Sequence, residues 1–373
     1  MVDRYSKRNS NIETLRIVAM WLIVAHHYIV HNVDFAGMDN NFWDWLILDV
    51  YFRNIGRIAV GLFLIVSIWY LCAKNQSLFD SCRRIWLLER ELLAYGIVIF
   101  ILSVLVSQDN LTLQSIANAF LPLYTGNWWF ASCYALLLLL IPFIFTGLQA
   151  LSKKQHLQLV FISIILFGLI RFIPHSALSG SVGMSLFVDF VLISIVVTYM
   201  RWHVGSETIK EKKVFFLFFG IGAFASMPVL SYLSLLNIRF VSSLASSFMN
   251  AFYTSPGFVL SLAVEFAFFV VAVTAPKRNC FFVNFVAATT FGIYLISDQI
   301  FVRNYLWQRI FSYSEFELLN SPLLSAIVAI SIVFIVCSIL DQIRIILFRL
   351  TIDRHPGRLF ERIYSKIIVR QSV

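Results

Sequence analysis

The chain has 373 residues, of which 60% are hydrophobic and only 13% are charged, and its mean hydropathy is +0.82. Soluble domains carry about 25% charged residues, so this composition excludes a soluble globular protein and predicts an integral membrane protein. The net charge of +9 does not indicate nucleic-acid binding, because the basic residues alternate with apolar segments as the positive-inside rule describes.

Ten apolar segments are long enough to cross a bilayer as helices, which takes about 20 residues each. Together they predict one membrane domain over residues 12–345, between an N-terminal segment, 1–11, and a tail, 346–373. The predicted spans cover residues 12–31, 55–73, 85–107, 128–149, 156–174, 183–202, 213–236, 252–275, 281–302 and 321–345. The fold class is therefore an all-α polytopic membrane protein, a single bundle of about ten transmembrane helices.

The distribution of Lys and Arg predicts that both the N-terminus and the C-terminus are cytoplasmic. Basic residues concentrate in the N-terminal segment, in alternate connections and in the tail, whereas the connections on the other side hold few of them. Those few are Arg53, Arg239, Arg303 and Arg309. Because cytoplasmic loops carry the excess of Lys and Arg, the richer side is predicted to be the cytoplasm. We do not expect a cleaved signal peptide, because the first apolar segment contains Arg16, His26 and His27 and lacks a small-residue cleavage site.

The first span carries a polar stripe. Six residues fall on one helix face: Glu13, Arg16, Met20, Ile23, His27 and His31. Eleven residues place Arg16 and His27 roughly 16 Å apart along the axis. Glu13 and Arg16 are three residues apart and are expected to pair. Ionisable side chains inside a membrane are costly and usually functional, although a structural salt bridge with a histidine bonded to a carbonyl remains an alternative.

His26 points away from this face and is expected to pack between helices. His27 and His31 are one turn apart, but no cysteine or carboxylate cluster accompanies them, so no metal site is expected. The segment 32–54 combines aromatic residues with Asp34, Asp39 and other carboxylates, which would suit a sugar, although an interfacial aromatic belt explains the tryptophans equally well.

The tail after Pro356 repeats basic residues every fourth position, with apolar residues on other faces. This pattern predicts an amphipathic helix on the anionic inner leaflet, with a disordered basic tail as the alternative.

Several segments resemble the membrane acyltransferase 3 family. Arg16, ten intervening residues and His27 match the arginine and histidine of that family's first helix. Further segments agree in order along about 11–345, and Ser67 matches a serine of the second helix. The matching segments are 11–31, 57–71, 83–85, 128–142 and 291–297. The chain departs from the family at Ser297, where many members carry histidine.

The resemblance implies a bacterial plasma-membrane O-acyltransferase that moves an acyl group, usually acetyl, from acetyl-CoA to a hydroxyl of a cell-surface polysaccharide or a lipid-linked sugar. His27 and Arg16 are the predicted catalytic residues, with His27 as general base or as transient acyl carrier, because histidine exchanges protons near neutral pH. The predicted binding residues fall into two groups. Arg16, Arg57, Arg83 and Arg84 are expected to bind the CoA donor, and Glu13, Ser67, Trp129, Tyr294 and Asp298 to contact the substrates.

Under this prediction the pantetheine arm of the donor runs along the polar face of the first span toward His27. Two rivals remain. One is a glycan transporter or flippase whose polar stripe lines a translocation path, although no two-fold repeat and no matching pair of broken helices indicates this. The other is a non-catalytic membrane protein in which the Glu13–Arg16 pair is structural.

Overall fold

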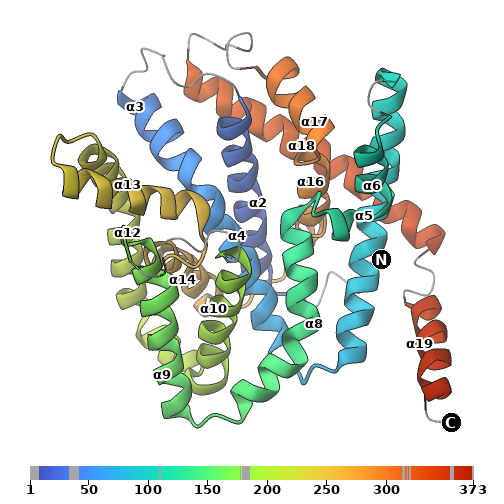
Figure 1. Ribbon diagram of the computed structural model, residues 1–373, viewed down its shortest axis with the longest axis horizontal. Coiled ribbons are helices and arrows are strands. Elements are labelled where there is room, and N and C mark those ends of the chain that lie inside the picture. The colour runs from blue at the N-terminus through green and yellow to red at the C-terminus, as the bar shows by residue number, and fades with distance from the viewer. Residues whose placement is uncertain are drawn as a thin grey trace.

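The computed structural model describes residues 8–32, 42–108, 111–176, 178, 185–312, 316, 318, 321–352 and 357–371. These residues form helices and connections, with no strand in the described ranges (Figure 1). Seven helices in this part of the chain are long and apolar enough to cross a bilayer, and two bent helix pairs raise the number to nine if each is one span. The fold class is thus confirmed as an all-helical bundle. The predicted number of about ten spans and the orientation of the termini stay predictions.

Helix α2 (Ser10–His31) lies at the centre of the bundle (Figure 1). It packs against α4 (Arg53–Leu71), α14 (Val259–Thr274), α16 (Thr290–Ser297) and α18 (Pro322–Leu350). Its small residues Ala19 and Ala25 are fully buried, which allows the neighbouring backbones to come close. At Gly56 of α4 a Cβ atom would overlap the His26 ring. The glycine therefore permits the tight contact between the first two spans.

The burial of each span separates the centre of the bundle from its periphery. The span Phe42–Leu71, which joins α3 (Phe42–Asp44), the π-helix η1 (Trp45–Phe52) and α4, has 83% of its apolar window buried. In α12 (Lys213–Ser234) only 17% is buried, and Phe215, Phe218 and Phe219 are exposed. An apolar face that the protein does not cover is the face expected to meet lipid.

The remaining helices fill in the bundle. After α5 (Leu78–Val106) come α6 (Leu113–Phe120), α7 (Pro122–Thr125) and α8 (Trp129–Gln149). The span Lys153–Phe172 consists of α9 (Lys153–Ser163), η3 (Ile164–Leu169) and η4 (Ile170–Phe172). It is followed by α10 (Ser185–Tyr199), η6 (Met200–Val204) and α11 (Ser206–Glu211).

Two predicted spans are bent rather than straight. The segment predicted as 252–275 contains α14 and only the end of α13 (Arg239–Thr254), and these two helices meet at 45°. The segment predicted as 281–302 contains α15 (Phe281–Ala287) and α16 and ends inside α17 (Ile300–Tyr305). A 79° bend separates α15 and α16 from α17 and η7 (Leu306–Ile310), which lies beyond the predicted end. At this bend the Gln299 side chain accepts hydrogen bonds from the backbone N–H groups of Phe301 and Val302, at 2.7 and 3.1 Å. A capped new helix start explains why the chain turns there.

Helix α5 begins seven residues before the predicted start at 85, because a capping box joins Ser77 and Asp80. Its charged residues explain why α5 is not among the seven helices that are apolar enough to count as membrane spans. Glu91 accepts a hydrogen bond of 2.6 Å from Arg344 of α18, and Arg344 also pairs with Asp341, which accepts a 2.6 Å hydrogen bond from Tyr95. This polar cluster ties α5 to α18 inside the bundle.

The tail forms a helix, α19 (Arg358–Gln371), at the edge of the molecule (Figure 1). Its aromatic residues Phe360 and Tyr364 lie against Phe79 of α5, with ring centroids 5.6 and 5.0 Å apart. Before the tail, α18 continues to Leu350, beyond the predicted end of the membrane domain at 345. The predicted contact of the tail with the inner leaflet stays a prediction.

Candidate functional site

The polar stripe of α2 borders two separate hollows. Glu13 and Arg16 line a large pocket at one end of the bundle, and Met20, Ile23 and His27 line a small cavity farther along the same face. The predicted pair of Glu13 and Arg16 is present at 3.5 Å, and Arg8 approaches the same carboxylate at 3.6 Å. One face of α2 therefore carries the charged residues Glu13 and Arg16 at one end and His27 farther along.

The large pocket, of about 740 Å³, is strongly basic. Connections far apart in the sequence meet here: the Ser10 N–H donates to the Arg278 carbonyl at 2.9 Å, and the Trp202 indole to the Cys72 carbonyl at 2.9 Å. Five cations and the single carboxylate of Glu13 line it among the described residues. The cations are Arg8, Arg16, Arg201, Lys277 and Arg278. We call this the basic pocket; its charge suits a ligand that carries several phosphates.

Aromatic side chains form part of the wall of the basic pocket. Trp69 and Tyr70 line it, and the Arg201 guanidinium lies 4.4 Å from the centre of the Trp69 ring. This cation–π contact holds Arg201 in place. The pocket thus combines fixed positive charge with a flat aromatic surface.

His27 lies at the far end of the stripe beside a carboxylate. Its Nε2 is 3.6 Å from Oδ1 of Asp298, an ion-pair distance that is too long for a hydrogen bond. Arg303 donates to the same Asp298 oxygen at 3.2 Å. His27 Nδ1 has no hydrogen-bond partner in the described part of the chain. One ring nitrogen thus faces an acid group while the other can accept a proton from a ligand.

The small cavity next to His27 has a volume of about 30 Å³ and is mostly apolar. Phe63, Trp129 and Tyr294 contribute to its lining, so two of the predicted contact residues are brought to His27. This cavity is large enough to hold a water molecule and too small for an acyl group with its acceptor. The cavity and the basic pocket share no lining residue. The two hollows are therefore separate, and the buried Phe63 lies between them: it lines the cavity, and its ring centre is 5.8 Å from the Arg16 guanidinium.

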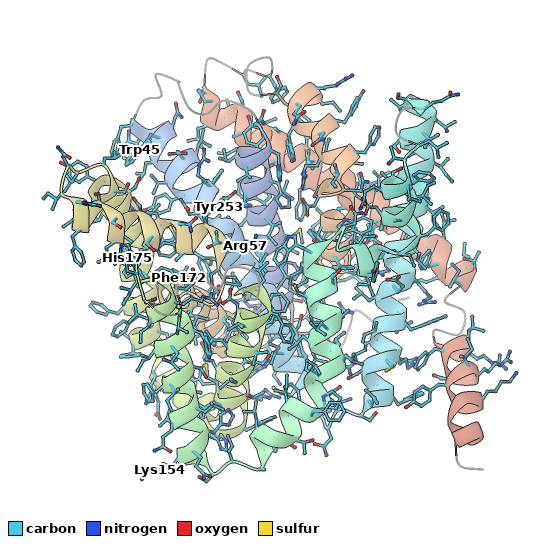
Figure 2. All side chains as sticks on the ribbon, in the orientation of Figure 1. Trp45, Arg57, Lys154, Phe172, His175 and Tyr253 are labelled. Carbon is cyan, nitrogen blue, oxygen red and sulfur yellow. The ribbon has the colours of Figure 1, made fainter. Side chains whose placement is uncertain are left out.

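Arg57 lies at the His27 end of the bundle, not at the basic pocket. The His26 ring bonds to the Arg53 carbonyl at 2.7 Å, one turn of α4 from Arg57, as expected for a packing histidine. The Arg57 guanidinium lies 4.2 Å from the centre of the Trp129 ring, and Figure 2 shows it inside the bundle close to Tyr253. Its Nε and Nη1 have no hydrogen-bond partner among the described residues. This placement does not suit a contact with phosphates at the basic pocket.

The other predicted donor residues also lie elsewhere. Arg83 pairs with Glu361 of α19 at 3.2 Å, and neither Arg83 nor Arg84 lines the basic pocket. Ser67 donates to the Phe63 carbonyl of its own helix at 2.9 Å and lines neither hollow. The prediction placed Arg83 and Arg84 at the donor site because they are expected on the same side of the membrane as Arg16. Residues on the same side of the membrane need not line the same pocket.

The predicted sugar-binding segment 32–54 is described only in part. Asp34 and Asp39 lie outside the described residues. Of the others, Asp44 is buried and Asp49 pairs with Arg53 at 2.7 Å. This part of the chain therefore adds no described carboxylate next to His27.

Sequence reasoning missed Arg303 and four cations of the basic pocket. Arg303 reaches Asp298 because the chain bends between α16 and α17. The four pocket cations come from three separate parts of the chain: the N-terminal segment, η6 and the connection after α14. They are Arg8, Arg201, Lys277 and Arg278. The excess of basic residues on one side of the membrane was the available signal. It predicts on which side these cations lie but not that they line one pocket.

A comparison with protein-family models adds one match. The model of the acyltransferase 3 family, described as an acyltransferase domain, matches residues 9–341, nearly the whole chain. No curated protein and no solved structure matches the chain.

Proposed function

The chain belongs to the acyltransferase 3 family of membrane acyltransferases, and on that premise we propose that it acts in the bacterial plasma membrane. It transfers an acyl group, usually acetyl, from cytoplasmic acyl-CoA to a hydroxyl of a cell-surface polysaccharide or a lipid-linked sugar. The observation that carries the proposal is the wall of α2, which presents Arg16 to a basic pocket at one end and His27 beside Asp298 at the other.

The basic pocket is the donor site in this proposal. CoA carries three phosphate groups, and the five cations of the pocket offer them charge-assisted and bidentate hydrogen bonds. The thioester end must then reach His27 along α2. Because the buried Phe63 lies between the two hollows, it has to move when the donor binds.

At the His27 end the proposed chemistry is direct transfer. The acceptor hydroxyl gives its proton to His27 Nδ1 as its oxygen attacks the thioester carbonyl. The N–H groups of Arg57 that have no partner among the described residues stabilise the oxyanion that forms. When the carbon–sulfur bond breaks, the CoA thiolate takes the proton from His27, and the acyl ester leaves with the sugar.

Asp298 favours His27 as a base rather than an acyl carrier. A carboxylate at 3.6 Å from Nε2 stabilises the imidazolium that exists while the proton is on the ring. Arg303 in turn holds Asp298 in place. The trio resembles, in its roles, the arrangement in which a carboxylate orients a catalytic histidine.

The test uses purified protein in lipid nanodiscs with radiolabelled acetyl-CoA and a cell-envelope glycan fraction. We expect label on the glycan with the wild type and a loss of about 10²- to 10⁴-fold in His27→Gln, with donor binding retained. Arg16→Gln is expected to weaken donor binding. The matched control is His175→Gln, because His175 is exposed and lies away from Arg57 at the side of the bundle (Figure 2).

Two results would contradict the proposal. Glycan movement across a vesicle membrane without label would support a transporter or flippase. A folded protein that neither binds CoA nor labels glycan would support a non-catalytic role.

A further inference from the structure

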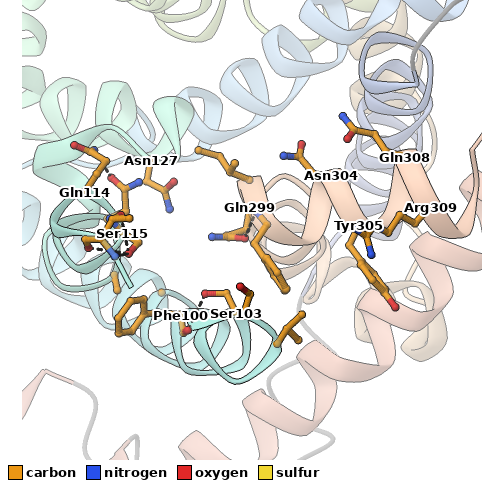
Figure 3. Close-up of a pocket in the computed structure, with 18 residues that line it drawn as sticks. Phe100, Ser103, Gln114, Ser115, Asn127, Gln299, Asn304, Tyr305, Gln308 and Arg309 are labelled. Atoms are coloured by element: carbon orange, nitrogen blue, oxygen red, sulfur yellow. Dashed lines mark hydrogen bonds between the residues drawn. The ribbon is translucent and has the colours of Figure 1, made fainter. Parts of the chain in front are cut away.

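A second large hollow lies between α5, α6 and the bent segment formed by α17 and η7 (Figure 3). Its volume is about 540 Å³, within the range of ligand sites. Carboxamide side chains dominate its polar lining, together with serine and threonine hydroxyls. The amides are Gln114, Asn118, Asn127, Gln299, Asn304 and Gln308. We call this hollow the amide cleft.

The amide cleft differs in charge from the basic pocket. Arg309 is the one charged residue among its described lining residues, and none of these is acidic. A carboxamide offers both hydrogen-bond donors and acceptors and carries no charge. Such a lining suits hydroxyl groups, which also donate and accept. A polyanionic chain would need several cations to replace its hydration.

The amide cleft and the His27 cavity share no lining residue, but two residues of the cleft are close in sequence to residues around His27. Gln299 follows Asp298 directly, and Asn127 lies two residues before Trp129, which lines the His27 cavity. The Trp128 indole donates to the Leu295 carbonyl of α16 at 3.1 Å and is fully buried. This bond fixes the Asn127 segment against the helix that leads to Asp298.

These two amides have groups left for a ligand. Asn127 Oδ1 is buried and has no hydrogen-bond partner within the described ranges. A buried polar atom without a partner is rare and calls for an explanation. The Gln299 oxygen caps α17, which leaves its amide nitrogen as a donor. Figure 3 shows Asn127 on the α6–α7 side of the cleft and Gln299 on the α17 side.

We propose that the amide cleft is the acceptor subsite and that it binds an uncharged oligosaccharide segment, whose reactive hydroxyl extends past Asn127 and Gln299 toward His27. This inference rests on the proposed acyl transfer, and it adds where the acceptor lies and that it is neutral. The segment belongs either to a free glycan or to a lipid-linked sugar, because the hydroxyl chemistry of the two is the same.

The experiment measures glycan binding without any acyl donor. Purified protein in nanodiscs is tested against gluco-, galacto- and N-acetylglucosamine oligosaccharides and against oligogalacturonate and hyaluronan fragments. One arm uses free oligosaccharides, and a second uses the same sugars attached to a lipid in the nanodisc. We expect binding of at least one uncharged series, and the arm with tighter binding identifies the source.

Three variants connect the binding to the cleft. Asn127→Ala and Asn304→Ala are each expected to weaken binding about 3- to 10-fold, the usual effect of one hydrogen bond. Asn127→Ala breaks no hydrogen bond of its Oδ1 to a described residue, so folding should be retained. Asn250→Ala is the matched control, because Asn250 is an exposed amide of α13 outside the cleft.

The failure of this inference and the failure of the proposed function can be told apart. Acetyl-CoA binding is measured on the same preparations. If acetyl-CoA binds but only anionic glycans or no glycans bind, or if the cleft variants bind as the wild type does, the amide cleft is not a neutral acceptor subsite. If neutral glycans bind but acetyl-CoA does not, the result supports the amide cleft as a glycan site and contradicts the proposed acyl transfer.

Discussion

Asp298→Asn is the substitution that most sharply separates a catalytic His27 from a structural one. The change removes a negative charge and keeps the shape of the side chain. Both partners are largely buried, with side-chain exposures of 10% for His27 and 7% for Asp298. The substitution therefore acts on the charge that faces the imidazole and not on packing.

The magnitude follows from the 3.6 Å separation. Two unit charges at that distance interact by about 4 to 5 kcal/mol at an effective dielectric constant of about 20. Arg303, at 3.2 Å from the same oxygen, offsets part of this field. If half of the interaction remains, the imidazolium loses about 2 kcal/mol of stabilisation, which corresponds to a rate lowered about 30-fold.

The assay is acetyl transfer from labelled acetyl-CoA at varied donor concentration. Because His27 is charged only while it holds the proton, we expect kcat to fall and the KM for acetyl-CoA to change little. Asp49→Asn is the control, since Asp49 pairs with Arg53 at a half-exposed position. A kcat within about threefold of the wild type, or an effect confined to KM, would refute the reasoning.

Four further predictions follow from the structure. Phe63→Trp puts a larger side chain in the wall of the His27 cavity, where Phe63 has to move for the donor, so transfer should fall while equilibrium binding of desulfo-CoA persists; equal loss of both would contradict this. Arg57→Gln should lower kcat about 10²- to 10³-fold, as the loss of an oxyanion donor does, and unchanged kcat would exclude that role. Arg278→Gln should raise the donor KM and leave kcat near the wild type, checked by initial rates. Ser77→Ala removes the N-cap of α5 and should cost about 1 kcal/mol, seen as a lower melting temperature in detergent. The Ser77 hydroxyl bond lowers the pKa of Asp80, so the stability that Asp80 adds is full above its unfolded pKa and is lost as the pH falls through the folded value; a variant effect that grows in acid would contradict this.

The sequence was most informative where one helix decides the geometry. The 3.6-residue repeat placed Glu13, Arg16 and His27 on one face, and the structure has the Glu13–Arg16 pair and both ends of that wall facing hollows. Apolar length likewise predicted most of the spans. These features are local, and helical geometry alone fixes them.

Features that depend on bends and on helix neighbours could not be predicted in the same way. The contact of Asp298 with His27 and Arg303 depends on a turn between α16 and α17, and hydropathy does not show a turn inside an apolar segment. Arg57 was assigned to the donor, although α4 runs antiparallel to α2 and its first turns lie beside His26. Successive spans cross the membrane in opposite directions, so the sequence already indicated that α4 begins on the side where α2 ends.

The amide cleft illustrates a third kind of gap. Apart from Arg309, its polar residues are uncharged; some come from α5, α6 and the chain up to Asn127, and the others from the segment from α17 to η7, which lies far away in the sequence. Single Asn and Gln residues carry no sequence signal for a site, because they are common in connections. Only their common orientation in three dimensions distinguishes them.

The central claim is that a bound acyl donor extends along one face of α2, from the basic pocket to His27. The most direct test is an electron cryomicroscopy structure of the protein with a non-hydrolysable acetyl-CoA analogue in nanodiscs. We expect the phosphates at Arg16 and Arg278, and the carbonyl carbon next to His27, with Phe63 displaced. Phosphates bound at Arg83 and Arg84, or an acyl end that stays in the basic pocket while transfer proceeds, would contradict the account.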